Sequence, residues 1–139
     1  MEISFPGGAR VDATFEGMVV ATDQPPSGGG QGSAPTPFNL FLASIGTCAG
    51  IYVLGFCRKR GIPTDGIRLT QSHQTDRSSG MISRIEVDVH LPPDFPEAYI
   101  EAVVRAADLC AVKKHLADPP HIEVQARIGD EEKGDGDKG

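Results

Sequence analysis

Residues 37–60 form one continuous run that is apolar almost all the way round a helix, and this run restricts the possible folds more than any other feature. Thr36 is a favourable N-cap and Pro37 suits the first helical position, while Gly61 and Pro63 end the segment. A helix of this length spans roughly 36 Å. A helix without a polar face is normally buried and central. In a chain of 139 residues, we expect a second subunit to supply part of its cover.

The remaining periodic segments indicate short antiparallel strands. Residues 11–21 alternate between polar and apolar types and are punctuated by glycine, which is typical of a small meander. The alternation is clearest in residues 82–91, which are expected to pair with residues 67–74 across a Ser-Gly turn. A last strand is predicted over residues 121–128.

A second helix is predicted over residues 94–116, where Asp94 and Glu97 have the spacing of a capping box. Prolines follow its expected end. The order of elements is strands, long helix, strands, helix and strand. This order predicts an α+β protein with antiparallel sheet packed against two core helices.

Composition excludes several classes of protein. A net charge of −6 argues against nucleic-acid binding, which needs a basic face. No run of about 18 apolar residues is recognised as a membrane span, and residues 1–4 lack a signal-peptide pattern. Three cysteines, an odd number, indicate a reducing compartment. We expect a cytoplasmic protein with one domain over residues 1–128 and a disordered acidic, glycine-rich tail over residues 129–139.

Two cysteines are the candidate reactive groups. Cys48 lies in the first predicted helix between Gly46 and Gly50, and Cys110 lies in the second, again among small and apolar residues. Each is either a small core residue or half of a redox pair, which needs Cα atoms within about 7 Å. Spacing leaves both interpretations open. Cys57, nine residues after Cys48, falls on the opposite face of its helix and is interpreted as structural.

Ligands for a metal or a phosphate group do not gather in the sequence. The four histidines show no paired-ligand spacing, and the cysteines form no Cys-x-x-Cys pair. The glycine-rich residues 25–33 are not followed by the Gly-Lys-Ser/Thr of a phosphate-binding loop. We therefore expect no metal and no cofactor.

Two segments resemble a known family. Residues 35–48 (Pro-Thr-Pro-Phe-Asn-Leu-Phe-Leu-Ala-Ser-Ile-Gly-Thr-Cys) are similar to the first cysteine motif of the OsmC/Ohr family, the osmotically inducible and organic hydroperoxide resistance proteins. Residues 106–116 are similar to the second motif, and the Asp23-Gln24-Pro25 turn with its glycine-rich loop also fits. The resemblance extends over most of residues 11–128.

The resemblance implies an OsmC-like fold in an intertwined homodimer, with two long central helices and active sites at the subunit interface. It further implies a peroxidase that reduces organic hydroperoxides. By motif, Cys48 would be the peroxidatic thiolate and Cys110 the resolving thiol, with a dithiol such as a lipoylated protein as the reductant. A nearby cation must lower the pKa of such a cysteine. Arg10 is the candidate for the activating arginine of the N-terminal strands.

The sequence departs from the family pattern at two places, and these keep a second function open. Phe38 and Asn39 stand where the family carries a glutamate that holds the arginine, and Ala111 replaces the proline after the second cysteine. The alternative is a non-enzymatic OsmC-like protein that binds a small apolar ligand at the dimer interface. The missing glutamate favours this alternative, whereas the presence of both Cys48 and Cys110 favours the enzyme.

Overall fold

The structure is a computed structural model, and it describes residues 1–129. In chain order the elements, with η for a short 3-10 turn, are β1 (Glu2–Gly7), β2 (Arg10–Phe15), β3 (Met18–Thr22), η1 (Pro26–Gly28), α1 (Pro37–Lys59), β4 (Arg68–Thr75), β5 (Ile82–His90), η2 (Glu97–Tyr99), α2 (Ile100–Asp108) and α3 (Ala111–Ala117). The strands form an antiparallel sheet β1-β2-β3 and an antiparallel hairpin β4-β5. The expected mixture of helices and antiparallel strands is confirmed.

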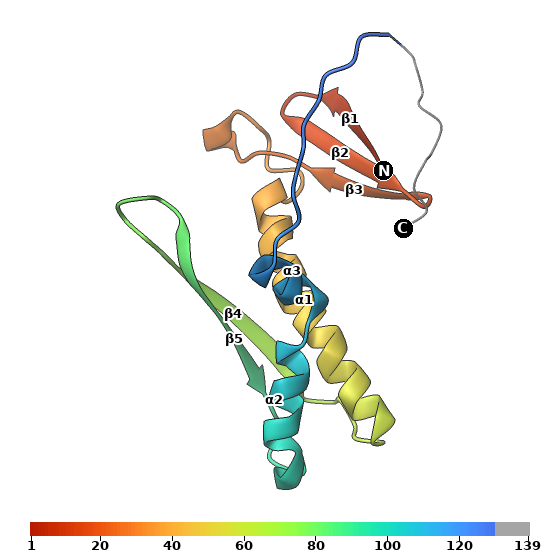
Figure 1. The fold of residues 1–139 in the computed structure, drawn as a ribbon, viewed down its shortest axis with the longest axis vertical. Coiled ribbons are helices and arrows are strands. Elements are labelled where there is room, and N and C mark those ends of the chain that lie inside the picture. Colours follow the sequence, from red (N-terminus) through yellow and green to blue (C-terminus); the bar gives the residue numbers. More distant parts are fainter. Residues whose placement is uncertain (130–139) are drawn as a thin grey trace.

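The long helix α1 organises the molecule (Figure 1). The three-stranded sheet lies beyond its N-terminal end, the β4-β5 hairpin lies along one side, and α2 and α3 pack against it in turn. Thr36 accepts a hydrogen bond from the N–H of Asn39 at 3.1 Å and so caps the first turn. At the other end Gly61 adopts a φ of +64°, and the N–H of Ile62 donates to the carbonyl of Cys57 at 3.0 Å. Both predicted ends of the helix are therefore confirmed.

The hydrophobic core lies between the C-terminal half of α1, helix α2 and the loop that precedes α2. Its buried members are Val53, Phe56, Cys57, Phe95 and Val103. In contrast, only 28 % of the most apolar 18-residue window of α1 is buried within the chain. A single chain therefore leaves much of its most apolar helix uncovered.

By length and composition α1 could cross a membrane, a property it shares with core helices of water-soluble proteins. The expectation that the chain holds no run of this kind is wrong for α1. The polar residues in the middle of the helix are small and uncharged, so they interrupt its apolar character only weakly.

One glycine of α1 allows β4 to approach the helix closely. The Nε2 of Gln71 donates to the carbonyl of Leu42 at 2.9 Å. A Cβ at Gly46 would lie 2.8 Å from Oε1 of the same glutamine, which is too close. The predicted tight approach is therefore found at Gly46, whereas a Cβ at Gly50 would meet nothing within 4 Å.

The single helix predicted over residues 94–116 is wrong: the structure divides it into η2, α2 and α3. Helix α2 begins at Ile100, and neither it nor η2 has a side-chain cap, so the capping box predicted at Asp94 and Glu97 does not form. The second break falls at Cys110, whose ψ of 141° is extended. This break starts a new helix at a cysteine, which is decisive for the site described below.

The strand predicted over residues 121–128 is absent from the single chain. This stretch has neither helix nor strand, and Ile122 and Val124 are 80 % and 93 % exposed. A strand needs a neighbouring backbone for its hydrogen bonds, and here neither sheet supplies one. Apart from Gly129, the predicted tail lies outside the described residues.

Candidate functional site

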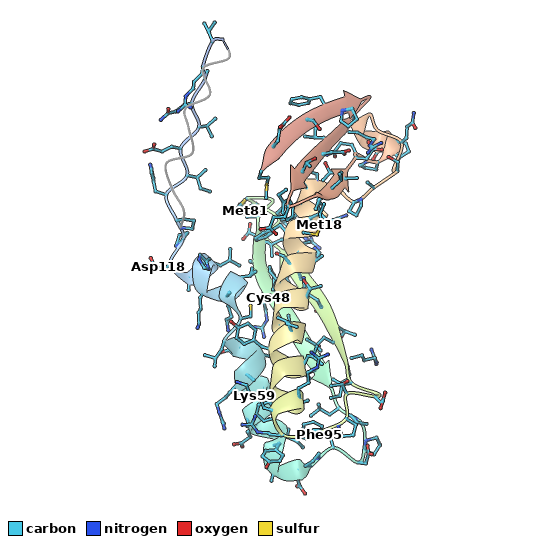
Figure 2. All side chains as sticks on the ribbon, turned by 90° about the vertical axis from the view of Figure 1, so that its right-hand side faces the viewer. Met18, Cys48, Lys59, Met81, Phe95 and Asp118 are labelled. Atoms are coloured by element: carbon cyan, nitrogen blue, oxygen red, sulfur yellow. The ribbon has the colours of Figure 1, made fainter. Side chains whose placement is uncertain are left out.

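Cys48 lies in the middle of α1 and faces the start of α3 (Figure 2). Its sulfur accepts hydrogen bonds from the backbone N–H groups of Val112 and Ala111, the first two residues of α3. These amides have no partner within their own helix, because the first N–H groups of any helix are free. The half-buried Cys48 therefore uses donors that the helix leaves available.

Cys110 occupies the N-cap position of the same short helix. Its sulfur accepts a hydrogen bond from the N–H of Lys113 at 3.3 Å, and the residue is 2 % exposed. The side chain of Cys110 also lies within hydrogen-bonding reach of the Cys48 sulfur. Both cysteines are free thiols. The structure thus brings together the two cysteines that the sequence separates by the whole middle of the chain.

These neighbours lower the pKa of Cys48 below that of an ordinary thiol. The N–H of Val112 contributes most, and the Cys110 side chain and the N–H of Ala111 add to it. Partial burial opposes them, because it disfavours the charged form. Hydrogen bonds to the ionised form stabilise that form, so Cys48 is the thiol of this pair that is prepared to act as a thiolate.

Cys57 lies in a different environment. It is completely buried in the core formed by α1 and α2. Burial raises the pKa of this thiol, and the nearby charge of Arg60 opposes the shift only in part. A buried neutral thiol is a weak nucleophile, which agrees with the structural role predicted for Cys57.

The structure places Arg10 away from both cysteines. It lies on β2, where its Nη2 forms an ion pair with Oδ2 of Asp12 at 2.8 Å. Its Nε and the Oδ1 of Asp12 are buried without a hydrogen-bond partner among the described residues. Arg10 is not one of the groups that shift the pKa of Cys48. Within one chain, the cation expected beside the thiol is replaced by backbone N–H groups.

Asp23 is a structural residue that the sequence analysis missed. It is 2 % exposed and accepts hydrogen bonds from the N–H groups of Gln24, Gln31 and Ser33 and from the hydroxyl of Ser33. The Ser33 hydroxyl is the main reason that its pKa falls to about 2. An aspartate directly before a Gly/Ser-rich loop is the signal that could have revealed it. Its carboxylate holds the glycine-rich loop in a defined shape.

The two departures from the family pattern have clear positions. The first turn of α1 contains no acidic residue, and Phe38 is 56 % exposed with its ring centroid 5.5 Å from that of Phe41. Ala111 is the first residue of α3, so its N–H is present where a proline would have none. This additional N–H is one of the donors to Cys48.

Within residues 1–129, no group of three or more His, Cys, Asp or Glu side chains could hold a metal ion. The histidines lie apart. His90 contacts the hydroxyl of Thr70, His115 contacts its own helix, and His121 pairs with Glu123. The chemistry available at the cysteine pair is therefore that of two adjacent thiols.

Comparisons with known proteins agree with this fold. A protein of Psychrobacter arcticus, described as an osmotic stress induced and detoxification response protein, superimposes with a TM-score of 0.69 at 18 % identity, over 81 % of this chain and 84 % of that one. A hypothetical protein of Aquifex aeolicus gives 0.64 at 16 % identity, over 85 % and 86 % of the two chains. No curated protein matches. The family model for OsmC-like proteins matches residues 30–125, which include both cysteine motifs, and the chain therefore belongs to the OsmC-like protein family.

Proposed function

We propose that the protein is a thiol-dependent peroxidase that reduces organic hydroperoxides, with Cys48 as the attacking thiolate and Cys110 as the resolving thiol. The observation that carries this proposal is the double contact of Cys48 with the first amides of α3 and with the side chain of Cys110. The first contact stabilises a nucleophile, and the second supplies a thiol to complete the reaction. Membership of the OsmC-like family supports a stress-response or peroxidase-related role in general terms.

The reaction balances with these two residues alone. The Cys48 thiolate attacks the terminal oxygen of the hydroperoxide; an S–O bond forms, the O–O bond breaks, and the leaving alkoxide takes a proton to become an alcohol. Cys48 is then a sulfenic acid. The sulfur of Cys110 attacks it, an S–S bond forms, and the hydroxyl leaves with the thiol proton as water. An external dithiol, for which a lipoylated protein is our candidate, returns two electrons and two protons.

A homodimer is part of the same proposal. A single chain leaves large apolar side chains in water, among them Phe5 at 81 %, Phe38 at 56 % and Ile122 at 80 % exposure. Monomeric soluble proteins rarely expose contiguous apolar surfaces of large size. A second copy would cover such surfaces, and it is also the source from which an arginine such as Arg10 could reach Cys48. Size-exclusion chromatography with light scattering tests the dimer, and a monomer at micromolar concentration would contradict it.

The test of the peroxidase is the fate of the thiols. Reduced protein mixed with one equivalent of cumene hydroperoxide should lose two thiols and yield a Cys48–Cys110 disulfide in non-reducing peptide maps. Cys57 should remain free. Slow oxidation that is equal at all three cysteines would overturn the proposal.

The second candidate, a non-enzymatic binding protein, is favoured by the absence of an acidic residue from the first turn of α1. That function does not require Cys48 to react. It predicts that Cys48→Ser protein keeps full ligand binding while the wild type shows no peroxide turnover, and the thiol experiment separates the two.

A further inference from the structure

An open apolar groove runs between α1 and α2 beside the cysteine pair. It has a volume of about 310 Å³. Ile51, Tyr52 and Gly55 line it from α1, and Ala106 from α2 together with Leu109 lines the other side. Gly55 keeps the groove wide, because a Cβ at this position would meet no atom within 4 Å. A larger side chain there would point into free space rather than into the core.

One end of the groove is close to the reactive thiol. Ile51 and Tyr52 follow Cys48 by three and four residues, which is one helical turn. Leu109 directly precedes Cys110. A ligand lying in the groove therefore has one end within a turn of both sulfurs.

The other end of the groove carries two cations, Lys59 and Arg60. Lys59 follows Cys48 by eleven residues, so it lies roughly 20° round the helix and about 16 Å along it. Figure 2 shows both residues on the side of α1 that faces α2 and α3. Within residues 1–129 the ammonium of Lys59 forms no ion pair. Arg60 is held in place, with its guanidinium carbon 3.7 Å from the ring centroid of Phe56.

We propose that this groove binds a long-chain monocarboxylate, with the carboxylate at Lys59 and Arg60 and the apolar chain directed toward Cys48. The combination of an apolar channel with a charged end matches an amphipathic anion and provides its polar group with a partner. Resting on the proposed function, the inference names the substrate class: hydroperoxides whose carboxylate lies far from the peroxide, such as those of long-chain fatty acids. Lys59 then determines specificity rather than chemistry.

Binding can be tested without any peroxide. Calorimetry on the reduced full chain should detect dodecanoate and show at least about tenfold weaker binding of dodecanol, which lacks the charge. Lys59→Glu should weaken dodecanoate binding by at least about tenfold. Arg58→Glu, a matched charge reversal on the same helix turn but outside the groove, should leave it unchanged. Gly55→Leu should block it.

Equal affinity for dodecanoate and dodecanol, equal losses in Lys59→Glu and Arg58→Glu, or no binding at all would each overturn the inference. Light scattering covers another occupant: if Gly55→Leu changes the oligomeric state, a second copy fills the groove and the inference is wrong. If Gly55→Leu fails to fold, the two charge reversals decide the question.

Turnover separates this inference from the function on which it rests. Linoleic acid hydroperoxide should be reduced with a KM at least about tenfold below that of its methyl ester, and Lys59→Glu should remove the difference. Cumene hydroperoxide is too short to reach Lys59 and should not be affected. Reduction of cumene hydroperoxide without preference for the acid over the ester would overturn the groove alone. Dodecanoate binding without turnover of any hydroperoxide would overturn the peroxidase alone.

Discussion

Cys48 and Cys57 belong to the same helix, nine residues apart, yet their surroundings act on them in opposite directions. The pKa of Cys48 is lowered, chiefly by the N–H of Val112. The pKa of Cys57 is raised by burial in an apolar core. Residue type and secondary structure are identical for the two thiols. The comparison shows that the reactivity of a cysteine depends on the neighbours that its face of the helix meets.

The largest expected effect is on turnover. Cys48→Ser should reduce hydroperoxide turnover by more than about a thousandfold, because it removes the nucleophile. Cys57→Ser should leave turnover unchanged but lower the free energy of unfolding by about 1–3 kcal/mol, since it buries a hydroxyl without a partner. Steady-state assays and urea unfolding measure the two effects. Loss of turnover in Cys57→Ser protein that is still folded would break the comparison.

Cys110→Ser should end turnover after a single reaction. The fold should survive, because serine is a favoured N-cap and can replace the sulfur as acceptor for the N–H of Lys113. Cys48 should then remain a sulfenic acid, detected by dimedone labelling and mass spectrometry. Continued turnover at the wild-type rate would show that Cys110 does not resolve the intermediate.

The two thiols should also affect stability with opposite pH dependence. An unfolded thiol has a pKa of about 8.5. Because the pKa of Cys48 is lowered on folding, its stabilisation is complete above about pH 8.5 and is lost as pH falls through the folded pKa. Because the pKa of Cys57 is raised, its stabilisation is complete below about pH 8.5 and is lost as pH rises through the folded pKa.

Urea unfolding of the wild type, Cys48→Ala and Cys57→Ala from mildly acidic to alkaline pH tests this prediction. Cys48→Ala should remove the part of the stability that rises toward pH 8.5, and Cys57→Ala the part that falls above it. Parallel pH curves for all three proteins would contradict the assigned environments.

The smallest effect is expected for Ala111→Pro. Proline suits the first position of α3, and the extended backbone of Cys110 before it is the conformation that a following proline favours. The substitution removes one of the N–H groups that donate to Cys48. The pKa of Cys48 should rise, and turnover at neutral pH should fall by a few-fold. Ultraviolet titration of the thiolate measures the shift; a lowered pKa would show that this N–H does not stabilise it.

The sequence predicted most of the fold because most of its signals are local. The ends of α1 follow from Thr36, Pro37 and Gly61, whose effects act within one helical turn. Signals that depend on distant partners were less informative. The strand expected over residues 121–128 has the right alternation but no neighbour in the chain, and the helix expected through Cys110 is interrupted there.

The sequence by itself determined that Cys48 lies on a long apolar helix and that Cys57 faces the other way, because the period of the helix fixes both. It also identified the OsmC-like family, through two motifs that can be read along the chain. Only the tertiary structure decided which thiol has free N–H donors, because the start of α3 reaches Cys48 by folding back across α1. Hydrogen bonds and burial act over a few ångströms in space, and distance along the chain does not report them.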